Sequence, residues 1–225
     1  MIRRPPRSTQ SRSSAASDVY KRQDTILDIG AGTGVLSLML AQRSDAMTID
    51  AVELDENAYE QTVENFESSD WGDRLYCYNA SFQEFAMEIS AEEETYDLII
   101  SNPPFYTDTF ETADASRNKA RFTSSLSFQE LILGVSKILS KTGHFAVIIP
   151  FKEKENFVSI AHENNLFLNR FCSVQGNPNS EIKRILLEFS FQVSEIIETH
   201  LVIEIKRHQY TEAYKNLTRD FYIKM

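Results

Sequence analysis

The sequence predicts a doubly wound α/β fold with a mostly parallel sheet of seven strands and an antiparallel hairpin at its C-terminal edge. Strand-like apolar runs alternate with helix-like segments, which is typical of a parallel sheet covered by helices on both faces. Two long β-like segments follow the last of these alternations and predict the terminal hairpin. The 225 residues are enough for one α/β domain with a substantial core.

Each predicted strand is a short run rich in apolar and β-branched residues. The seven strands of the sheet are Thr25–Ile29, Thr48–Glu53, Leu75–Tyr78, Tyr96–Ser101, His144–Ile149, Leu166–Val174 and Ile185–Phe191, with one more strand predicted at Leu201–Ile205. The predicted helices are Val35–Gln42, Glu56–Phe66, Phe82–Met87, Phe128–Leu139, Glu153–Asn164 and Thr211–Phe221. The run Lys141-Thr142-Gly143 is interpreted as the stop signal of the fourth helix.

The first 23 residues differ in composition from the rest of the chain. They are rich in Arg, Ser and Pro and nearly free of large apolar side chains, so they cannot bury enough surface to fold and are expected to be disordered. Three interpretations compete: a transit peptide, a disordered RNA-attracting arm, and a non-native segment that resembles translated sequencing-adapter sequence. The abrupt change at Asp24 favours the third, and residues 24–225 are expected to form the folded domain.

Composition and charge argue against several classes of protein. The formal net charge is -10, which argues against a generic nucleic-acid binder, and any RNA would have to meet a local basic patch. No apolar run is long enough to span a bilayer, so no membrane partner is expected. The two cysteines and four scattered histidines have no metal-ligand spacing, so no metal site is expected. A reduced, cytoplasmic monomer is the expectation.

A glycine-rich turn follows the first strand. Asp28 precedes Gly30, Gly32 and Gly34, and the glycines allow a tight turn and a close approach of the backbone to a ligand. The third glycine comes one position earlier than in the dinucleotide-binding motif. An acid at Asp28 would repel a pyrophosphate and attract a cationic amino-acid end. The pattern therefore favours S-adenosyl-L-methionine over a nicotinamide cofactor.

Further cofactor contacts are predicted at the ends of the second and third strands. Glu53, followed by Leu54, is placed to accept hydrogen bonds from both hydroxyls of a ribose, whereas the nearby Asp55 is interpreted as a helix N-cap. Ser81 and Phe82 follow the third strand, where a cofactor adenine should lie. Their alternative interpretation is a helix cap followed by a core aromatic residue.

The tetrapeptide Asn102-Pro103-Pro104-Phe105 follows the fourth strand. An exocyclic amine is a poor nucleophile because its lone pair is delocalised into the ring. The side-chain oxygen of Asn102 and the carbonyl of Pro103 can accept the two amine hydrogens and direct the lone pair toward a methyl group. The prolines stiffen the turn, and Phe105 can stack on the base. These four residues are the predicted catalytic group, with Asn102 also beside the cofactor.

With these motifs in place, the chain resembles the class I S-adenosylmethionine-dependent methyltransferases, and within them the bacterial tRNA(Val) adenine-37 N6-methyltransferases. The segments that carry the resemblance are 27–34, 50–54, 97–106, 120–123, 210–214 and 221–222. It implies a Rossmann-like methyltransferase sheet, with the methionine end of the cofactor at Asp28, Gly30 and Gly32 and a further cofactor contact at Ala31. It also implies tRNA as the partner.

The resemblance further implies substrate contacts after the tetrapeptide, at Tyr106, Arg117 and Arg121. Two features depart from the family pattern. Ser81 stands where these proteins often carry an acid. In addition, residues 1–23 replace a segment that usually helps to close the cofactor site, so we expect this chain to be less active than a version with a family-like N-terminus.

Other targets share the same chemistry and stay open at this level. A guanine N2 amine in ribosomal RNA and the amide of a protein glutamine can be held by the same tetrapeptide. Such enzymes usually add a recognition domain, and none is visible in this sequence. A non-catalytic RNA-binding protein with a vestigial cofactor fold is the non-enzyme alternative, and the intact tetrapeptide argues against it.

Overall fold

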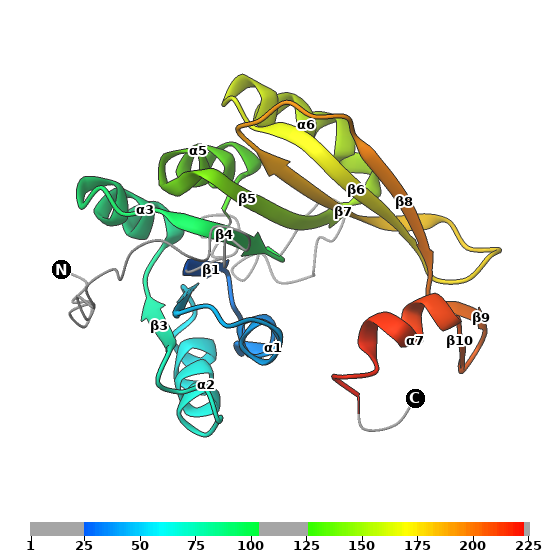
Figure 1. Cartoon of the computed structure of the whole chain (residues 1–225), viewed down its shortest axis with the longest axis horizontal. Coiled ribbons are helices and arrows are strands. Elements are labelled where there is room, and N and C mark those ends of the chain that lie inside the picture. Colours follow the sequence, from blue (N-terminus) through cyan, green and yellow to red (C-terminus); the bar gives the residue numbers. More distant parts are fainter. Residues whose placement is uncertain (1–24, 104–125, 223–225) are drawn as a thin grey trace, which may run out of the picture.

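The computed structural model describes residues 25–103 and 126–222. Within these residues, eight strands form one sheet in the order β3-β2-β1-β4-β5-β7-β6-β8, and β9 and β10 form a separate pair (Figure 1). The strands are β1 (Thr25–Ile29), β2 (Thr48–Glu53), β3 (Leu75–Asn79), β4 (Tyr96–Ser101), β5 (Leu139–Pro150), β6 (Phe167–Gln175), β7 (Ile182–Ser190), β8 (Ile197–Val202), β9 (Glu204–Lys206) and β10 (Gln209–Tyr210).

The predicted doubly wound sheet and its C-terminal antiparallel hairpin are confirmed. Strands β1 to β5 pair with one another in parallel, and β7 is antiparallel to both β5 and β6. Strand β8 adds an eighth member because it pairs in parallel with β6. The β6–β7 hairpin is therefore covered on its outer side, and β8 forms that edge of the sheet.

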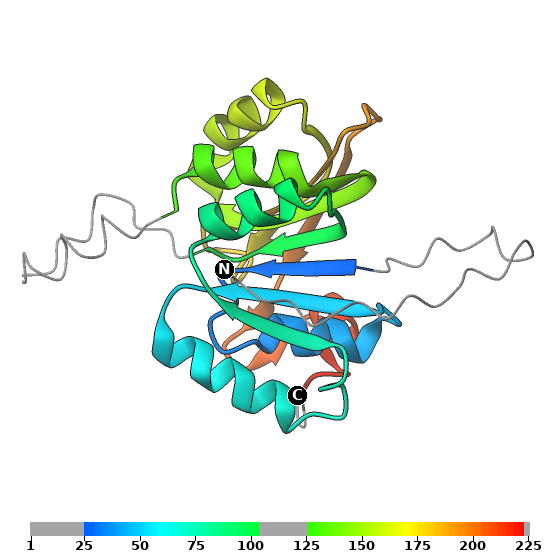
Figure 2. The ribbon, with the colours of Figure 1, turned by 90° about the vertical axis from the view of Figure 1, so that its left-hand side faces the viewer.

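Helices cover the sheet on both faces (Figure 2). The described helices are α1 (Val35–Arg43), α2 (Glu56–Glu67), α3 (Phe82–Ala91), α5 (Phe128–Ile138), α6 (Lys154–Glu163) and α7 (Glu212–Thr218), with a 3-10 turn at Phe151–Glu153. Helices α3, α5 and α6 pack their apolar side chains into one large core with β4, β5 and β7. Helices α1 and α2 form a smaller core against β1 and β2 on the other face.

Side-chain caps begin four of these helices. The carboxylate of Asp55 accepts a hydrogen bond from the backbone of Ala58 at 2.9 Å, which confirms its interpretation as an N-cap. Ser81 caps α3, Ser127 forms a full capping box on α5, and Thr211 caps α7. These residues set where α2, α3, α5 and α7 start, and two of them stand directly after strands that reach the candidate site.

One predicted stop signal is wrong. Helix α5 ends at Ile138 and passes into β5 without an intervening turn, so Lys141-Thr142-Gly143 lies inside the strand. Gly143 is instead required for packing, because a Cβ there would lie 2.9 Å from the carbonyl oxygen of Tyr96. The glycine permits a close approach between β4 and β5 and does not end the helix.

The predicted strand at Leu201–Ile205 is divided in the structure. Strand β8 ends at Val202, and the backbone N–H of Ile203 donates to the carbonyl of Gln175 at 2.9 Å. The chain then leaves the sheet as β9, turns, and returns as β10. Helix α7 follows and brings the C-terminal segment to α1, where the Arg43 guanidinium donates to the carbonyl of Leu217 at 2.7 Å and covers the ring of Phe221.

No helix in the described ranges is long and apolar enough to cross a membrane. The segment 1–23, for which three origins were weighed from composition, lies outside the described residues.

Gly34 begins α1 in a left-handed conformation with φ +77°. A Cβ at this position would lie 2.6 Å from the ring of Phe66 and 2.9 Å from the methyl group of Thr62. Both neighbours belong to α2 and are buried. Gly34 is therefore required for backbone conformation and for packing between the glycine turn and α2.

We predict that Gly34→Ala lowers the free energy of unfolding by about 2–4 kcal/mol, because it adds left-handed strain to overpacking. Gly176→Ala is the control, since its Cβ would meet its nearest neighbour, Ser180 Oγ, at an ordinary 3.4 Å. Urea unfolding of both variants measures the difference. Equal stability of the two variants would contradict the requirement for glycine at position 34.

Candidate active site

The carboxyl ends of four parallel strands meet at one edge of the sheet, and hydrogen bonds tie them together. The backbone N–H of Gly30 donates to the carbonyl of Val52 at 2.9 Å, and that of Ala80 donates to Glu53 at 3.2 Å. The buried hydroxyl of Ser101 donates to the carbonyl of Ile29 at 2.9 Å. The ends of β1, β2, β3 and β4 are thus fixed relative to one another before any ligand binds.

The glycine turn leaves space on its outer side. Gly30 and Gly32 have φ values of +71° and +61°, and no atom lies within 4 Å of the place where a Cβ would stand. Glycine at these two positions therefore avoids backbone strain and leaves room for a ligand to approach the main chain. The prediction that these residues form a tight turn after β1 is confirmed.

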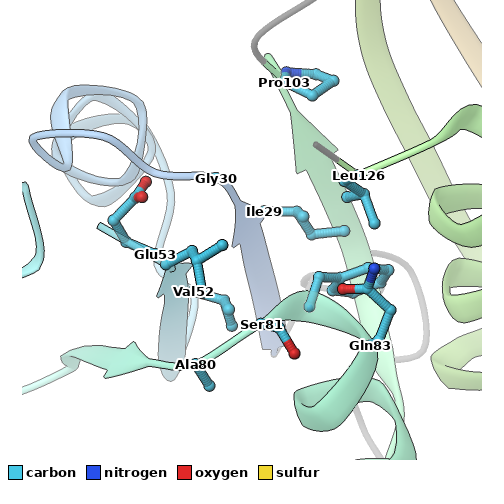
Figure 3. Close-up of a pocket in the computed structure, with 11 residues that line it drawn as sticks. Ile29, Gly30, Val52, Glu53, Ala80, Ser81, Gln83, Pro103 and Leu126 are labelled. Carbon is cyan, nitrogen blue, oxygen red and sulfur yellow. The ribbon is translucent and has the colours of Figure 1, made fainter. Parts of the chain in front are cut away.

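Glu53 links this turn to the start of α2. One carboxylate oxygen of Glu53 accepts from the backbone N–H of Gly32 at 2.8 Å, and the other accepts from Asp55 at 2.9 Å. Each carboxylate oxygen can accept more than one hydrogen bond, so capacity remains for hydroxyl donors. Figure 3 shows the carboxylate of Glu53 turned toward the loop that contains Gly30.

Helix α2 holds the same turn from the other side. The buried hydroxyl of Thr62 lies 2.7 Å from the carbonyl oxygen of Gly32, and the Asn65 side chain donates to the carbonyl of Thr33 at 2.9 Å. Sequence reasoning missed both residues. The signal for Thr62 was its spacing of four residues from Ala58 and from Phe66, which places it on the buried face of the helix.

Asp28 is fully buried beneath the turn. The hydroxyl of Ser37 donates to its Oδ2 at 2.8 Å, while its Oδ1 has no hydrogen-bond partner among the described residues. Burial raises the pKa of Asp28 to about 6, the two hydrogen bonds from Ser37 oppose that rise, and the negative charge of Glu53 adds to it. The unpartnered Oδ1 leaves an acceptor for a cationic or hydrogen-bonding group.

Ser37 was also missed from the sequence, although a signal existed. It is a polar residue inside an otherwise apolar helical run, and such a residue is often there for a buried partner. Ser37 and Ala41 are the buried residues of α1.

A pocket opens between the turn and the start of α3 (Figure 3). Its walls come from the ends of β1, β2, β3 and β4 and from the residue before the cap of α5. They consist of Ile29, Gly30, Val52, Glu53, Leu54, Ala80, Ser81, Phe82, Gln83, Pro103 and Leu126. Six of the predicted site residues therefore line one cavity: Gly30, Glu53, Leu54, Ser81, Phe82 and Pro103.

Ser81 and Phe82 are a helix cap and a core aromatic residue, and both also line the pocket. The hydroxyl of Ser81 accepts from the backbone of Glu84 at 3.2 Å and donates to the Glu84 carboxylate at 2.7 Å, so it is occupied as a helix cap. Phe82 belongs to the large core and packs against Gly134. Both nevertheless face the pocket, where they offer a backbone edge and an apolar wall.

The reactive tetrapeptide is described in part. Asn102 is exposed at the end of β4, whereas Pro103 is buried and lines the pocket. Asp28, Ala31, Gly32 and Asn102 adjoin the pocket wall in sequence without lining it. The predicted residues Pro104, Phe105, Tyr106, Arg117 and Arg121 lie outside the described residues.

Two other kinds of chemistry find no support in the described ranges. No group of three or more His, Cys, Asp or Glu side chains there is arranged to hold a metal ion. Cys77 lies in β3, and burial raises the pKa of its thiol to about 12, so it is not a thiolate nucleophile at neutral pH.

Comparisons with known proteins agree with this geometry. Residues 15–158 match the family described as methyltransferase small domain. The tRNA1(Val) (adenine(37)-N6)-methyltransferase of Christiangramia forsetii is 56% identical over 202 residues, which are 90% of this chain and 84% of that protein. The protein of the same name from Flavobacterium johnsoniae is 52% identical over 208 residues, which cover 92% of this chain and 87% of the relative.

Solved structures share the fold at low identity. A predicted O-methyltransferase from Agrobacterium tumefaciens superposes with a TM-score of 0.65 at 16% identity, over 90% of this chain and 91% of its own. A putative RNA methyltransferase from Pyrococcus horikoshii gives a TM-score of 0.56 at 18% identity, over 76% of each chain.

The buried carboxylate of Asp28 predicts a pH-dependent loss of stability. Below pH 3.8 the Asp28 carboxyl group is protonated in both the folded and the unfolded chain, so its burial does not lower the free energy of unfolding there. Between pH 3.8 and about 6 the unfolded chain loses the proton first, so stability falls, by about 3 kcal/mol in total. Asp28→Asn removes this contribution.

Urea unfolding of both proteins from pH 4 to pH 7 measures the effect. Relative to Asp28→Asn, the wild-type chain should become less stable as the pH rises through this window. Parallel pH profiles would show that burial of Asp28 imposes no such cost.

Proposed function

This chain belongs to the methyltransferase small domain family, and from that premise we propose that it transfers a methyl group from S-adenosyl-L-methionine to the exocyclic N6 of an adenine in tRNA, with adenine-37 of tRNA(Val) as the target. The observation that carries the proposed reaction is that Pro103, of the predicted reactive tetrapeptide, lines the same pocket as Gly30 and Glu53. The tRNA target is taken from relatives that share more than half of their aligned residues with this chain.

The described residues fit the proposed cofactor. The unpartnered Oδ1 of Asp28 would receive the ammonium group of the methionine end, directly or through a water molecule. Glu53 would accept the ribose hydroxyls with the capacity left beside its two backbone contacts. The adenine would rest between Leu54 and Phe82, and because the Ser81 hydroxyl is engaged as a cap, its edge would meet backbone groups.

When bound, S-adenosyl-L-methionine would supply an electrophilic methyl group on a sulfonium sulfur. The chain's part is to orient the target amine. The Asn102 side-chain oxygen and the Pro103 carbonyl would accept its two hydrogens and turn the lone pair toward the methyl carbon. Transfer would form the N–C bond and break the methyl–sulfur bond, with S-adenosylhomocysteine as the leaving group. The methylated amine would then lose one proton to water, so no strong general base would be needed. Holding the amine in line with the methyl donor would supply much of the rate.

The test is methyl transfer from labelled S-adenosyl-L-methionine to unmodified tRNA(Val), followed by digestion of the RNA and mass spectrometry of its nucleosides. We expect labelled N6-methyladenosine from the wild-type transcript and none from a transcript that carries guanosine at position 37. Label in N2-methylguanosine would overturn the proposed base specificity. Binding of the cofactor with no transfer would support a non-catalytic RNA-binding protein.

We predict that Asn102→Ala lowers kcat by about 100-fold or more, because the amine loses one of its two aligning acceptors. Its affinity for S-adenosylhomocysteine should stay within about threefold of wild type, since the cofactor contacts of Asp28 and Glu53 remain. The control is Asn216→Ala, which removes an exposed asparagine of α7 outside the pocket. A kcat of Asn102→Ala equal to that of the control would contradict the assigned role.

A further inference from the structure

Most basic side chains of the described residues already have partners within the fold. Arg43, Lys152, Arg170, Lys215 and Arg219 each form an ion pair, Arg74 donates to three backbone carbonyls, and Lys154 covers the ring of Phe171. Six others are exposed and have no acidic partner within 4 Å in the described part of the chain. They are Lys137, Lys141, Lys183, Arg184, Lys206 and Arg207.

Four of these six unpaired cations lie at the end of the sheet where the parallel strands terminate. This is also the end that carries the candidate active site. Lys183 and Arg184 are the second and third residues of β7, which runs antiparallel to β5, and Arg184 is paired with Pro150 at the carboxyl end of β5. Lys206 and Arg207 lie on the β9–β10 hairpin, which starts where β8 ends (Figure 1). We call Lys183, Arg184, Lys206 and Arg207 the basic edge.

The two halves of the basic edge are brought together by β6. Ile182, at the start of β7, is paired with Gln175 at the end of β6. On the other side of β6, Gln175 and Gly176 accept the backbone N–H groups of Ile203 and Glu204, each at 2.9 Å. One strand therefore separates the halves, a distance on the order of 10 Å. In the sequence they are more than twenty residues apart.

The acids next to these cations in sequence leave them unpaired. Glu181 and Glu204 flank the four cations, and neither forms an ion pair with them among the described residues. His208, at the hairpin turn, has φ +64° and is exposed beside Arg207. Within residues 181–184 and 204–207, four permanent positive charges thus outnumber two carboxylates, in a chain whose formal net charge is -10.

We infer that the basic edge binds phosphate groups of the tRNA backbone and orients the RNA so that its target base reaches the pocket. This inference rests on the proposed function. Arginine and lysine are the usual donors to phosphate oxygens, and such contacts set the position of a nucleic acid without reading its sequence. The edge adjoins the carboxyl ends of the strands, so RNA held there lies on the same side of the sheet as Pro103 and Glu53.

The remaining two cations provide a matched control. Lys137 lies in the last turn of α5 and Lys141 near the start of β5. Both therefore lie at the amino ends of the parallel strands, at the opposite end of the sheet from the basic edge. Both are exposed and equally unpaired. The double variants Lys183→Ala/Arg184→Ala, Lys206→Ala/Arg207→Ala and Lys137→Ala/Lys141→Ala each remove two positive charges, so they change the net charge of the chain equally.

The experiment measures two quantities with the full chain and unmodified tRNA(Val). The first is the dissociation constant from fluorescence anisotropy at several salt concentrations, and the second is KM and kcat for methyl transfer. Each variant of the basic edge should weaken tRNA binding and raise KM by about tenfold, with kcat within twofold of wild type. The salt dependence, as the slope of log K against log salt, should become shallower by about 1 to 2. Affinity for S-adenosylhomocysteine should not change.

The outcomes separate this inference from the proposed function. Methyl transfer by the wild-type chain tests the function independently of the variants. The inference is overturned if both basic-edge variants bind tRNA as tightly as the Lys137→Ala/Lys141→Ala control, or if all three variants weaken binding equally. Because anisotropy reports binding without turnover, these results are decisive even for a chain that transfers no methyl group.

Discussion

The candidate active site depends on the two hydrogen bonds that the carboxylate of Glu53 accepts. This carboxylate accepts from Gly32 in the glycine turn and from Asp55 at the start of α2, so one side chain joins two segments that belong to different strand–helix units. A turn with several left-handed residues has few internal hydrogen bonds and needs such external partners. Glu53 also lines the pocket, and its oxygens keep capacity for ligand hydroxyls.

Around this contact the strand ends form one connected layer. Backbone and hydroxyl hydrogen bonds link β3 to β2, β2 to β1, and β1 to β4. These hydrogen bonds hold the layer together, and it carries a cost at Asp28, whose carboxylate is held out of water. A carboxylate kept in this state, with one oxygen unpartnered, is more consistent with ligand binding than with stability.

Much of this architecture follows from local sequence. Strands β1, β2 and β4 have the predicted boundaries because each is a short apolar run closed by an acid, a glycine turn or a proline. The glycine turn and Glu53 could be placed for the same reason. Gly143 misled the prediction because a glycine needed for strand packing looks the same in sequence as one that ends a helix.

What could not be predicted depends on register and on distant pairing. Ser37 and Thr62 act through partners in other elements, and their hydrogen bonds appear only when α1 and α2 are packed. The approach of Lys183-Arg184 to Lys206-Arg207 requires the order β7-β6-β8, which no local pattern specifies. Each basic pair by itself resembles ordinary charged surface. Only their proximity at the same end of the sheet suggests that they bind RNA phosphates together.

The central claim is that Glu53 fixes the glycine turn and recognises the cofactor ribose with the same carboxylate. It is tested most directly by calorimetric titration of wild type and Glu53→Gln with S-adenosylhomocysteine and with its analogue lacking the ribose hydroxyls. Loss of the hydroxyls should weaken binding to wild type by at least about tenfold, and should have little further effect on Glu53→Gln. An equal loss of affinity in both proteins would contradict the claim.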